Sequence, residues 1–310
     1  MKIPGLRKAV ERLEKRLEKH LQGRHNQLSH GRGGGGSARR SGRGRSSKPG
    51  KEEPKNSYTR IKDIPDDFEK ALEGIKTEED ASLVAMKHRL PEIKASRYRD
   101  DGKKLEALRM GLRGAKQCKD AIEGDPLYAD ADLVPNKVTV MNVDQVGGGD
   151  YNHYAGEYHW RGDTAEIAAS GRVMRLNSHS ESMSLIPGEH NVDISVEGTV
   201  RHEIGHHVHY DLDNRYGRAS KRAAWKEFEQ WADEKIASKN MNDPDSPARL
   251  SLYAMANSHE AFAEAFCMYT HPRFDRTNQG KNGSPKMPPT AHRILQNLMK
   301  GERRTFSLAD

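Results

Sequence analysis

The chain has 310 residues and a formal net charge of +7, and only 34% of its residues are apolar, with a mean hydropathy of −0.95. This length suffices for one sizeable domain with extensions, and the low hydropathy predicts that part of the chain stays outside a packed core. No apolar run approaches the ~18 residues of a membrane span, and a charged N-terminus and two cysteines argue against a secretory signal and a disulfide framework.

The first 56 residues carry all of the net positive charge. They contain 16 Lys and Arg against 5 Asp and Glu, a net of +11, which leaves −4 for the remainder. Residues 1–22 are predicted to form an amphipathic helix that is too short for a free coiled coil and is suited to docking on a partner. Residues 23–56, rich in Gly, Arg and Ser, are predicted to be a disordered linker. This basic tail can bind nucleic acid without reading its sequence, or serve only as a solubilising linker.

Residues 57–125 are predicted to be a helical segment. Apolar residues recur at helical spacing in the stretches 66–74, 77–90 and 101–123, and no catalytic grouping occurs among them. We therefore interpret this segment as a cover on the domain that follows.

Residues 126–310 are predicted to form an α+β domain. Short apolar, β-branched and aromatic runs predict strands at 137–143, 154–160, 166–169 and 172–176. Helical periodicity predicts further helices at 219–238 and 291–300, with loops at 239–249 and 272–290.

The most informative stretch is 200–210, Val-Arg-His-Glu-Ile-Gly-His-His-Val-His-Tyr. It contains a His-Glu-x-x-His pattern, and on a helix of 3.6 residues per turn His202 and His206 project from one face and can reach one metal ion. Glu203 lies too far round the helix to join them and is well placed to take a proton from a metal-bound water. Gly205 lowers helix propensity, which indicates that another element packs closely against it.

Two histidines do not complete a zinc site, because a third protein ligand is required. In the stretch 250–270, Glu260 and Glu264 lie four residues apart on one face of a second predicted helix, with Asn257 or Ser258 as its N-cap. Two inward-facing carboxylates are costly to bury unless they meet a cation. The spacing therefore indicates a carboxylate ligand supplied by this later helix.

These two stretches together resemble the metallopeptidase domain of lethal-factor-like proteins, which are zinc peptidases of the gluzincin class. The resemblance rests on the Tyr253-x6-Glu260 spacing and on the Ser-x-Glu-x-Phe-Ala-Glu run that begins at Ser258. It implies a zincin-like fold, with a small twisted sheet whose edge strand binds an extended protein or peptide substrate.

The resemblance also implies a role for each candidate site residue. Zn²⁺ is expected to be held by His202, His206 and Glu260. Glu203 is the expected general base, and Tyr253 the expected donor to the oxyanion of the tetrahedral intermediate. Glu264 is expected to orient a ligand histidine through its other ring nitrogen.

A second resemblance concerns residues 20–31, His-Leu-Gln-Gly-Arg-His-Asn-Gln-Leu-Ser-His-Gly, which are similar to a segment of phage head and portal-associated proteins. It implies a phage-encoded endopeptidase, made in the host cytoplasm and packaged in the virion, whose N-terminal helix binds a capsid or portal component. Two alternatives stay open. One is a virion structural or nucleic-acid-binding protein whose zinc fold is not catalytic, and the other is a toxin-like effector protease.

Overall fold

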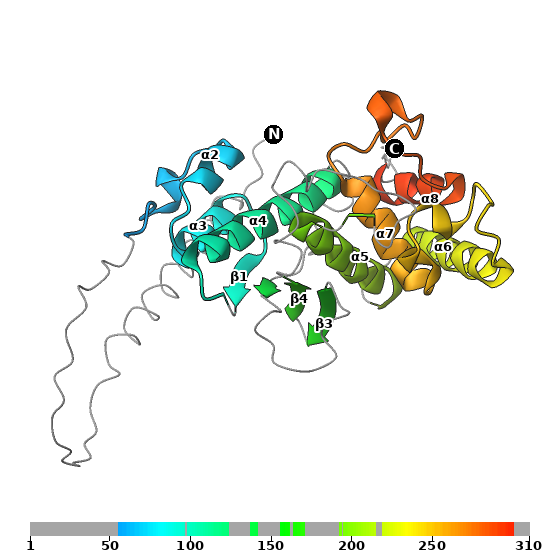
Figure 1. Ribbon diagram of the computed structural model, residues 1–310, viewed down its shortest axis with the longest axis horizontal. Coiled ribbons are helices and arrows are strands. Elements are labelled where there is room, and N and C mark those ends of the chain that lie inside the picture. Colours follow the sequence, from blue (N-terminus) through cyan, green and yellow to red (C-terminus); the bar gives the residue numbers. More distant parts are fainter. Residues whose placement is uncertain are drawn as a thin grey trace, which may run out of the picture. The chain divides into compact units, whose positions relative to one another are not determined.

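The computed structural model (Figure 1) describes residues 55–96, 98–123, 137–141, 156–161, 164–170, 192–193, 195–214 and 219–300. They belong to one compact unit, Glu53–Asp310. The amphipathic helix predicted at 1–22, the linker as far as residue 54 and the strand predicted at 172–176 lie outside the described residues.

The segment predicted to be helical contains, in order, the 3-10 turn η1 (Ile61–Asp63), α2 (Phe68–Glu73), α3 (Glu78–Lys87), strand β1 (Glu92–Ser96) and α4 (Asp101–Glu123). The three predicted helices are confirmed. Strand β1 was not predicted: its burial alternates, with Ile93 and Ala95 buried on either side of exposed Lys94, but five residues carry too weak a signal beside long helices.

The sheet contains β1, β2 (Lys137–Met141), β4 (Thr164–Ser170) and β3 (Gly156–Arg161), in that spatial order. Strands β1, β2 and β4 run parallel, whereas β3 pairs antiparallel with β4 and forms the edge among the described strands. Helix α4 contacts β1 and β2, and α5 (Val196–Asn214) contacts β4 and β3, so these two helices form a layer over the sheet (Figure 1).

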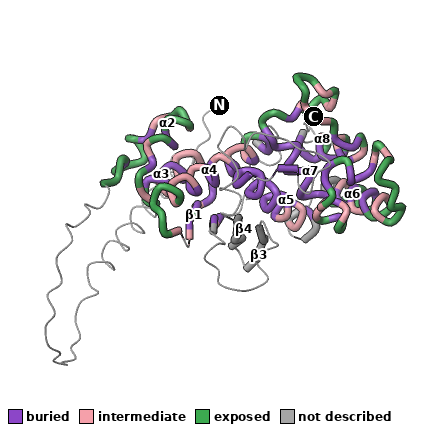
Figure 2. The backbone as a smooth tube through the Cα atoms, viewed as in Figure 1, coloured by how far each residue is buried: buried purple, intermediate pink, exposed green. Residues whose placement is uncertain are grey.

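Helix α5 is the centre of the helical layer, because it packs against α4 on one side and α7 (Ser258–Thr270) on the other. Its buried apolar stripe repeats every fourth residue: Val196, Val200, Ile204, Val208 and Leu212. Figure 2 shows burial concentrated along α4, α5 and α7. Helices α6 (Ala219–Ser238) and α8 (Pro289–Lys300) pack against each other and against α7.

Glycines allow α5 to approach both neighbours closely. A Cβ atom at Gly205 would lie 3.0 Å from the Ala263 Cα atom of α7 and 3.2 Å from the Phe266 Cβ atom. A Cβ atom at Gly114 of α4 would lie 2.9 Å from the Glu197 carbonyl oxygen. The expectation that another element packs against Gly205 is confirmed.

Three short 3-10 turns complete the described elements: η5 (Pro247–Arg249), η6 (Tyr253–Met255) and η7 (Lys281–Gly283). The first lies at the end of the predicted 239–249 loop and the last within the predicted 272–290 loop. Mostly helical structure with a small sheet makes the fold α+β, as predicted. Among the described helices, none is both long and apolar enough to cross a membrane.

Candidate metal site

Three side chains from two helices meet between α5 and α7. His202 and His206 project from one face of α5, as the four-residue spacing predicts, and Glu260 reaches them from the first turn of α7. Asn257 is the N-cap of α7, because its side-chain oxygen accepts the Glu260 N–H at 2.9 Å. This cap fixes the start of the helix and hence the position of the Glu260 carboxylate.

The three candidate ligand atoms form a nearly equilateral triangle. The His202 Nε2 atom lies 3.1 Å from the Glu260 Oε2 atom and 3.1 Å from the His206 Nε2 atom. The third edge, from His206 Nε2 to Glu260 Oε2, is 3.2 Å. Tetrahedral zinc with bonds of about 2.0–2.1 Å separates its ligands by about 3.3 Å. The donor set and the size of the triangle therefore fit a zinc ion.

Glu264 lies one turn after Glu260 on α7 and is almost completely buried, with 1% of its surface exposed. Its Oε1 atom is 2.7 Å from the His202 Nδ1 atom, so the carboxylate directs the other ring nitrogen of His202 towards the triangle. Its Oε2 atom accepts the Val192 N–H at 2.6 Å. The structure therefore brings Glu264 to the histidine that the sequence analysis expected it to orient.

Tyr253, in turn η6, lies beside the same ligands. Its ring stacks on the His202 ring with centroids 5.8 Å apart. Burial and the negative charges of Glu260 and Glu203 raise the pKa of Tyr253, so the phenol stays protonated. Glu203 itself is buried in α5, and its charge also acts on His202. All six candidate site residues thus come together.

The electrostatics of the site favour a cation at the triangle. Burial lowers the pKa of His202, but hydrogen bonds with Glu260 and Glu264 outweigh this effect and raise it to about 10. Burial also opposes ionisation of Glu260, but hydrogen bonds from His202 and His206 outweigh it and lower the pKa of that carboxyl. These carboxylates stabilise positive charge on or between the imidazoles, which a proton or a metal ion can carry.

A second buried polar group lies on the other side of α5 and was not predicted. Arg201 is fully buried, and its guanidinium donates to the Asp193 carboxylate and to the Gln117 side chain of α4. His271, also buried, has its Nε2 atom 3.8 Å from the Asp193 Oδ2 atom. The Asp193 Oδ1 atom accepts the Ser195 N–H at 2.8 Å, so this group holds the segment that enters α5.

The signals for this second group were weak in the sequence. An arginine next to the apolar stripe of the 200–210 helix is the local sign that a buried carboxylate lies opposite. Asp193 is eight residues away, but Gln117 and His271 are distant in the sequence, so their place in this group depends on the packing of α4, α5 and the residues that follow α7.

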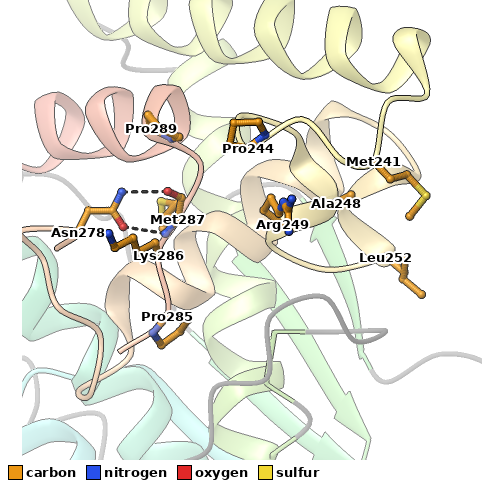
Figure 3. Close-up of a pocket in the computed structure, with 10 residues that line it drawn as sticks. All are labelled: Met241, Pro244, Ala248, Arg249, Leu252, Asn278, Pro285, Lys286, Met287 and Pro289. Atoms are coloured by element: carbon orange, nitrogen blue, oxygen red, sulfur yellow. Dashed lines mark hydrogen bonds between the residues drawn. The ribbon is translucent and has the colours of Figure 1, made fainter. Parts of the chain in front are cut away.

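The described residues also enclose a pocket of about 640 Å³ between the segments 241–252 and 278–289 (Figure 3). It is lined by Met241, Pro244, Ala248, Arg249, Leu252, Asn278, Pro285, Lys286, Met287 and Pro289. None of the six candidate site residues lines it, although Leu252 directly precedes Tyr253. The pocket is therefore distinct from the triangle between α5 and α7.

Comparisons of the chain with protein-family models, with curated proteins and with solved structures find no match. The chemistry of the site is therefore argued from its own atoms. Two imidazoles and a carboxylate at zinc spacing, a buried carboxylate and a phenol together can hold a metal ion and transfer protons beside it.

Proposed function

We propose that the protein is a zinc-dependent endopeptidase of the lethal-factor-like gluzincin class, with a zincin-like fold in residues 126–310. The observation that carries this proposal is the triangle of His202, His206 and Glu260 with edges of 3.1–3.2 Å. Three protein ligands leave a tetrahedral ion one open position, which is typical of catalytic and not of structural zinc sites.

The residues around the triangle supply the remaining parts of peptide hydrolysis. Bound Zn²⁺ would supply a Lewis acid beside the scissile carbonyl. Glu203 accepts the proton of the attacking water and later returns it to the leaving amine. The Tyr253 hydroxyl, protonated because of its raised pKa, donates a hydrogen bond to the oxyanion of the tetrahedral intermediate.

The sheet supports a peptide substrate. Among the described strands β3 lies at the edge and contacts α5, and an extended peptide can add to such an edge through main-chain hydrogen bonds. The phage resemblance of residues 20–31 places this activity with a virion or its maturation, with capsid, portal or nucleic acid as partners of the N-terminal residues. These partners are part of the proposal.

Replacing Glu203 with glutamine tests the proposal. Glutamine is nearly isosteric and cannot accept the proton, so hydrolysis of a casein-like substrate should fall by about 10²–10⁴-fold. Zinc content and melting temperature should stay close to those of the unaltered protein. Glu234→Gln, on the exposed part of α6, is the matched control and should leave the rate unchanged.

Two outcomes would contradict the proposal. Hydrolysis that survives Glu203→Gln within a few-fold would assign the base to another residue. Absence of hydrolysis in the unaltered, zinc-loaded protein across a broad set of protein substrates would favour the non-catalytic alternative.

A further inference from the structure

The pocket between segment 241–252, its first wall, and segment 278–289, its second wall, gathers exposed apolar side chains. Among the described residues, three large apolar side chains are exposed, and two of them, Met241 and Leu252, line this pocket at 48% exposure each. Figure 3 shows both on one side of the pocket and Lys286 on the other. Single exposed apolar residues are normal on a protein surface, whereas a pair gathered at a cavity is typical of a binding site.

Hydrogen bonds fix the two walls of the pocket. In the second wall, the Asn278 side chain donates to the Met287 carbonyl at 2.9 Å and accepts the Met287 N–H at 2.7 Å (Figure 3). Asp245 of the first wall accepts the hydroxyl of Thr290 at 2.7 Å and its N–H at 2.9 Å. Because Thr290 directly follows the second wall, these two bonds tie the walls together. The pocket of about 640 Å³ is therefore preformed, and its size is that of a ligand site.

The charged groups of the pocket are cations. Its ten described lining residues include Arg249 and Lys286 and no acidic side chain. Both cations are exposed, and neither forms an ion pair with another described residue. The Arg249 guanidinium donates to the Asn242 carbonyl at 3.1 Å, and the Lys286 side chain lies against Gly280, where a Cβ atom would be 3.3 Å from its Cε atom. These contacts hold the two cations at the pocket, where an anionic ligand can reach them.

The charges around the pocket indicate which ligand it accepts. The nearest carboxylates have other partners, since Asp243 pairs with Lys235 at 2.7 Å and Asp245 accepts from Thr290. The basic N-terminal tail, with a net charge of +11, is a poor match for a cationic pocket. An extended peptide with alternating apolar and acidic side chains matches both its apolar rim and its cations.

The pocket adjoins the candidate metal site through the chain itself. Leu252 is followed by Tyr253, whose ring stacks on the His202 ring with centroids 5.8 Å apart. Consecutive Cα atoms are about 3.8 Å apart, so a peptide held against Leu252 lies close to the ligands.

We propose that this pocket binds an apolar and acidic segment of the peptide substrate, at a distance from the bond that is cleaved. The inference rests on the proposed function for the identity of the ligand as a substrate. Binding of such a segment does not itself require hydrolysis, so the two can be tested separately.

The first test measures peptide binding to the full chain with Glu203→Gln, which keeps the probe intact. The probes are two labelled peptides with the cores Leu-Glu-Leu-Glu and Leu-Gln-Leu-Gln, followed by fluorescence anisotropy at low salt. We expect the glutamate peptide to bind about tenfold more tightly, because each exposed ion pair contributes up to about fivefold. Leu252→Ala should weaken both peptides, and Ile61→Ala, at the third exposed apolar side chain, is the matched control. Equal binding of the two peptides would overturn the inference.

A charge reversal tests the role of the two cations. Arg249→Glu combined with Lys286→Glu should reverse the preference, so that a Leu-Lys-Leu-Lys peptide binds more tightly than the glutamate peptide. Lys62→Glu, at an exposed residue that does not line the pocket, is the control and should keep the original preference. An unchanged preference in the double variant would overturn the inference. A concentration-dependent dimer in sedimentation that Leu252→Ala abolishes would assign the pocket to a second copy of the chain instead.

The second test asks whether the bound segment belongs to a substrate. A cleaved peptide that carries the Leu-Glu-Leu-Glu core on a flexible Gly-Ser linker should have about tenfold lower KM than its Leu-Gln-Leu-Gln counterpart. This advantage should disappear in the Arg249→Glu, Lys286→Glu variant. Equal KM values alongside selective peptide binding would overturn the assignment to a substrate. Absence of hydrolysis of either peptide by the zinc-loaded protein would overturn the proposed function, whereas the binding selectivity would stand.

Discussion

Two buried polar clusters lie on different sides of α5 and meet its consecutive residues Arg201 and His202. The cluster around Arg201 contains its own cation, because the guanidinium pairs directly with Asp193. In the cluster around His202, the carboxylates of Glu260 and Glu264 pair with the imidazoles of His202 and His206, which are positively charged only when protonated. The positive charge that stabilises these two buried carboxylates is therefore a proton on an imidazole or a bound metal ion.

The two clusters differ in the source of the positive charge that offsets their buried carboxylates. In the Arg201 cluster the cost of burial is offset within the fold, and its members hold α4, α5 and the segment before α5 together. In the His202 cluster, the charges of Glu260 and Glu264 are offset by imidazoles that carry a proton or share a metal ion. Metal removal should therefore affect the His202 cluster more than the Arg201 cluster. Loss of the Arg201–Asp193 pair should instead affect mainly the stability of the fold.

The largest effect is expected at the triangle itself. Glu260→Ala removes a ligand, so stoichiometric zinc should be lost, whereas Glu264→Ala should retain zinc with roughly 10–100-fold weaker affinity. Metal analysis after dialysis and chelator competition measure both. Retention of zinc in Glu260→Ala and its loss in Glu264→Ala would shift the ligand assignment by one turn of α7.

The Arg201 cluster should instead show a large effect on folding. Arg201→Met leaves the Asp193 carboxylate buried without its cation, which typically costs about 3–5 kcal/mol. Adding Asp193→Asn removes that charge and keeps an acceptor for the Ser195 N–H, so the double variant should recover part of the loss. Urea unfolding at saturating zinc measures this, and strictly additive losses would show that the pair does not act as a unit.

The smallest effect concerns acid sensitivity at His271. Burial and the nearby Arg201 and Arg273 lower its pKa to about 2, whereas in the unfolded chain the pKa is near 6.5. Above pH 6.5 the imidazole is neutral in both states. Below it only the unfolded state binds the proton, so the free energy of unfolding falls by up to about 1.4 kcal/mol per pH unit.

His271→Asn tests this expectation, because asparagine cannot titrate and can still accept the Arg273 N–H that the His271 Nδ1 atom accepts at 3.1 Å. Between pH 7 and 5 the unaltered protein should lose about 2 kcal/mol more stability than the variant. Parallel pH profiles for the two proteins would show that His271 is not responsible.

Much of the fold and of the site was predictable because the signals were local. Long periodic stretches predicted α4 and α6, and the spacing of His202 and His206 predicted that these two side chains would meet. The resemblance to lethal-factor-like proteins supplied the choice of Glu260 as their partner. Strand β1 was missed because a five-residue alternation is weaker than the helices around it. The other misses are long-range: Arg201 and Gln117 are 84 residues apart, and no local pattern connects them.

Ser251 illustrates the same limit at short range. Its capping role can be read from a serine three residues before the Ala254 N–H, but its complete burial depends on how η6 packs against α7. The surroundings of a candidate ligand thus depend on tertiary packing, whereas the pairing of His202 and His206 follows from helical spacing alone.

The close approach at Gly205 has a consequence for metal selectivity. Because the ligands come from α5 and α7, the distance between these helices sets the size of the triangle, and Gly205 permits that distance. A methyl group there would lie 3.0 Å from Ala263 Cα, inside the ~3.5–4.0 Å optimum for carbon atoms, and would push the helices apart. A wider triangle matches the ~2.3–2.6 Å bonds of larger cations better than those of zinc. Under the proposed zinc function, the choice of ion would be controlled from a position that has no side chain.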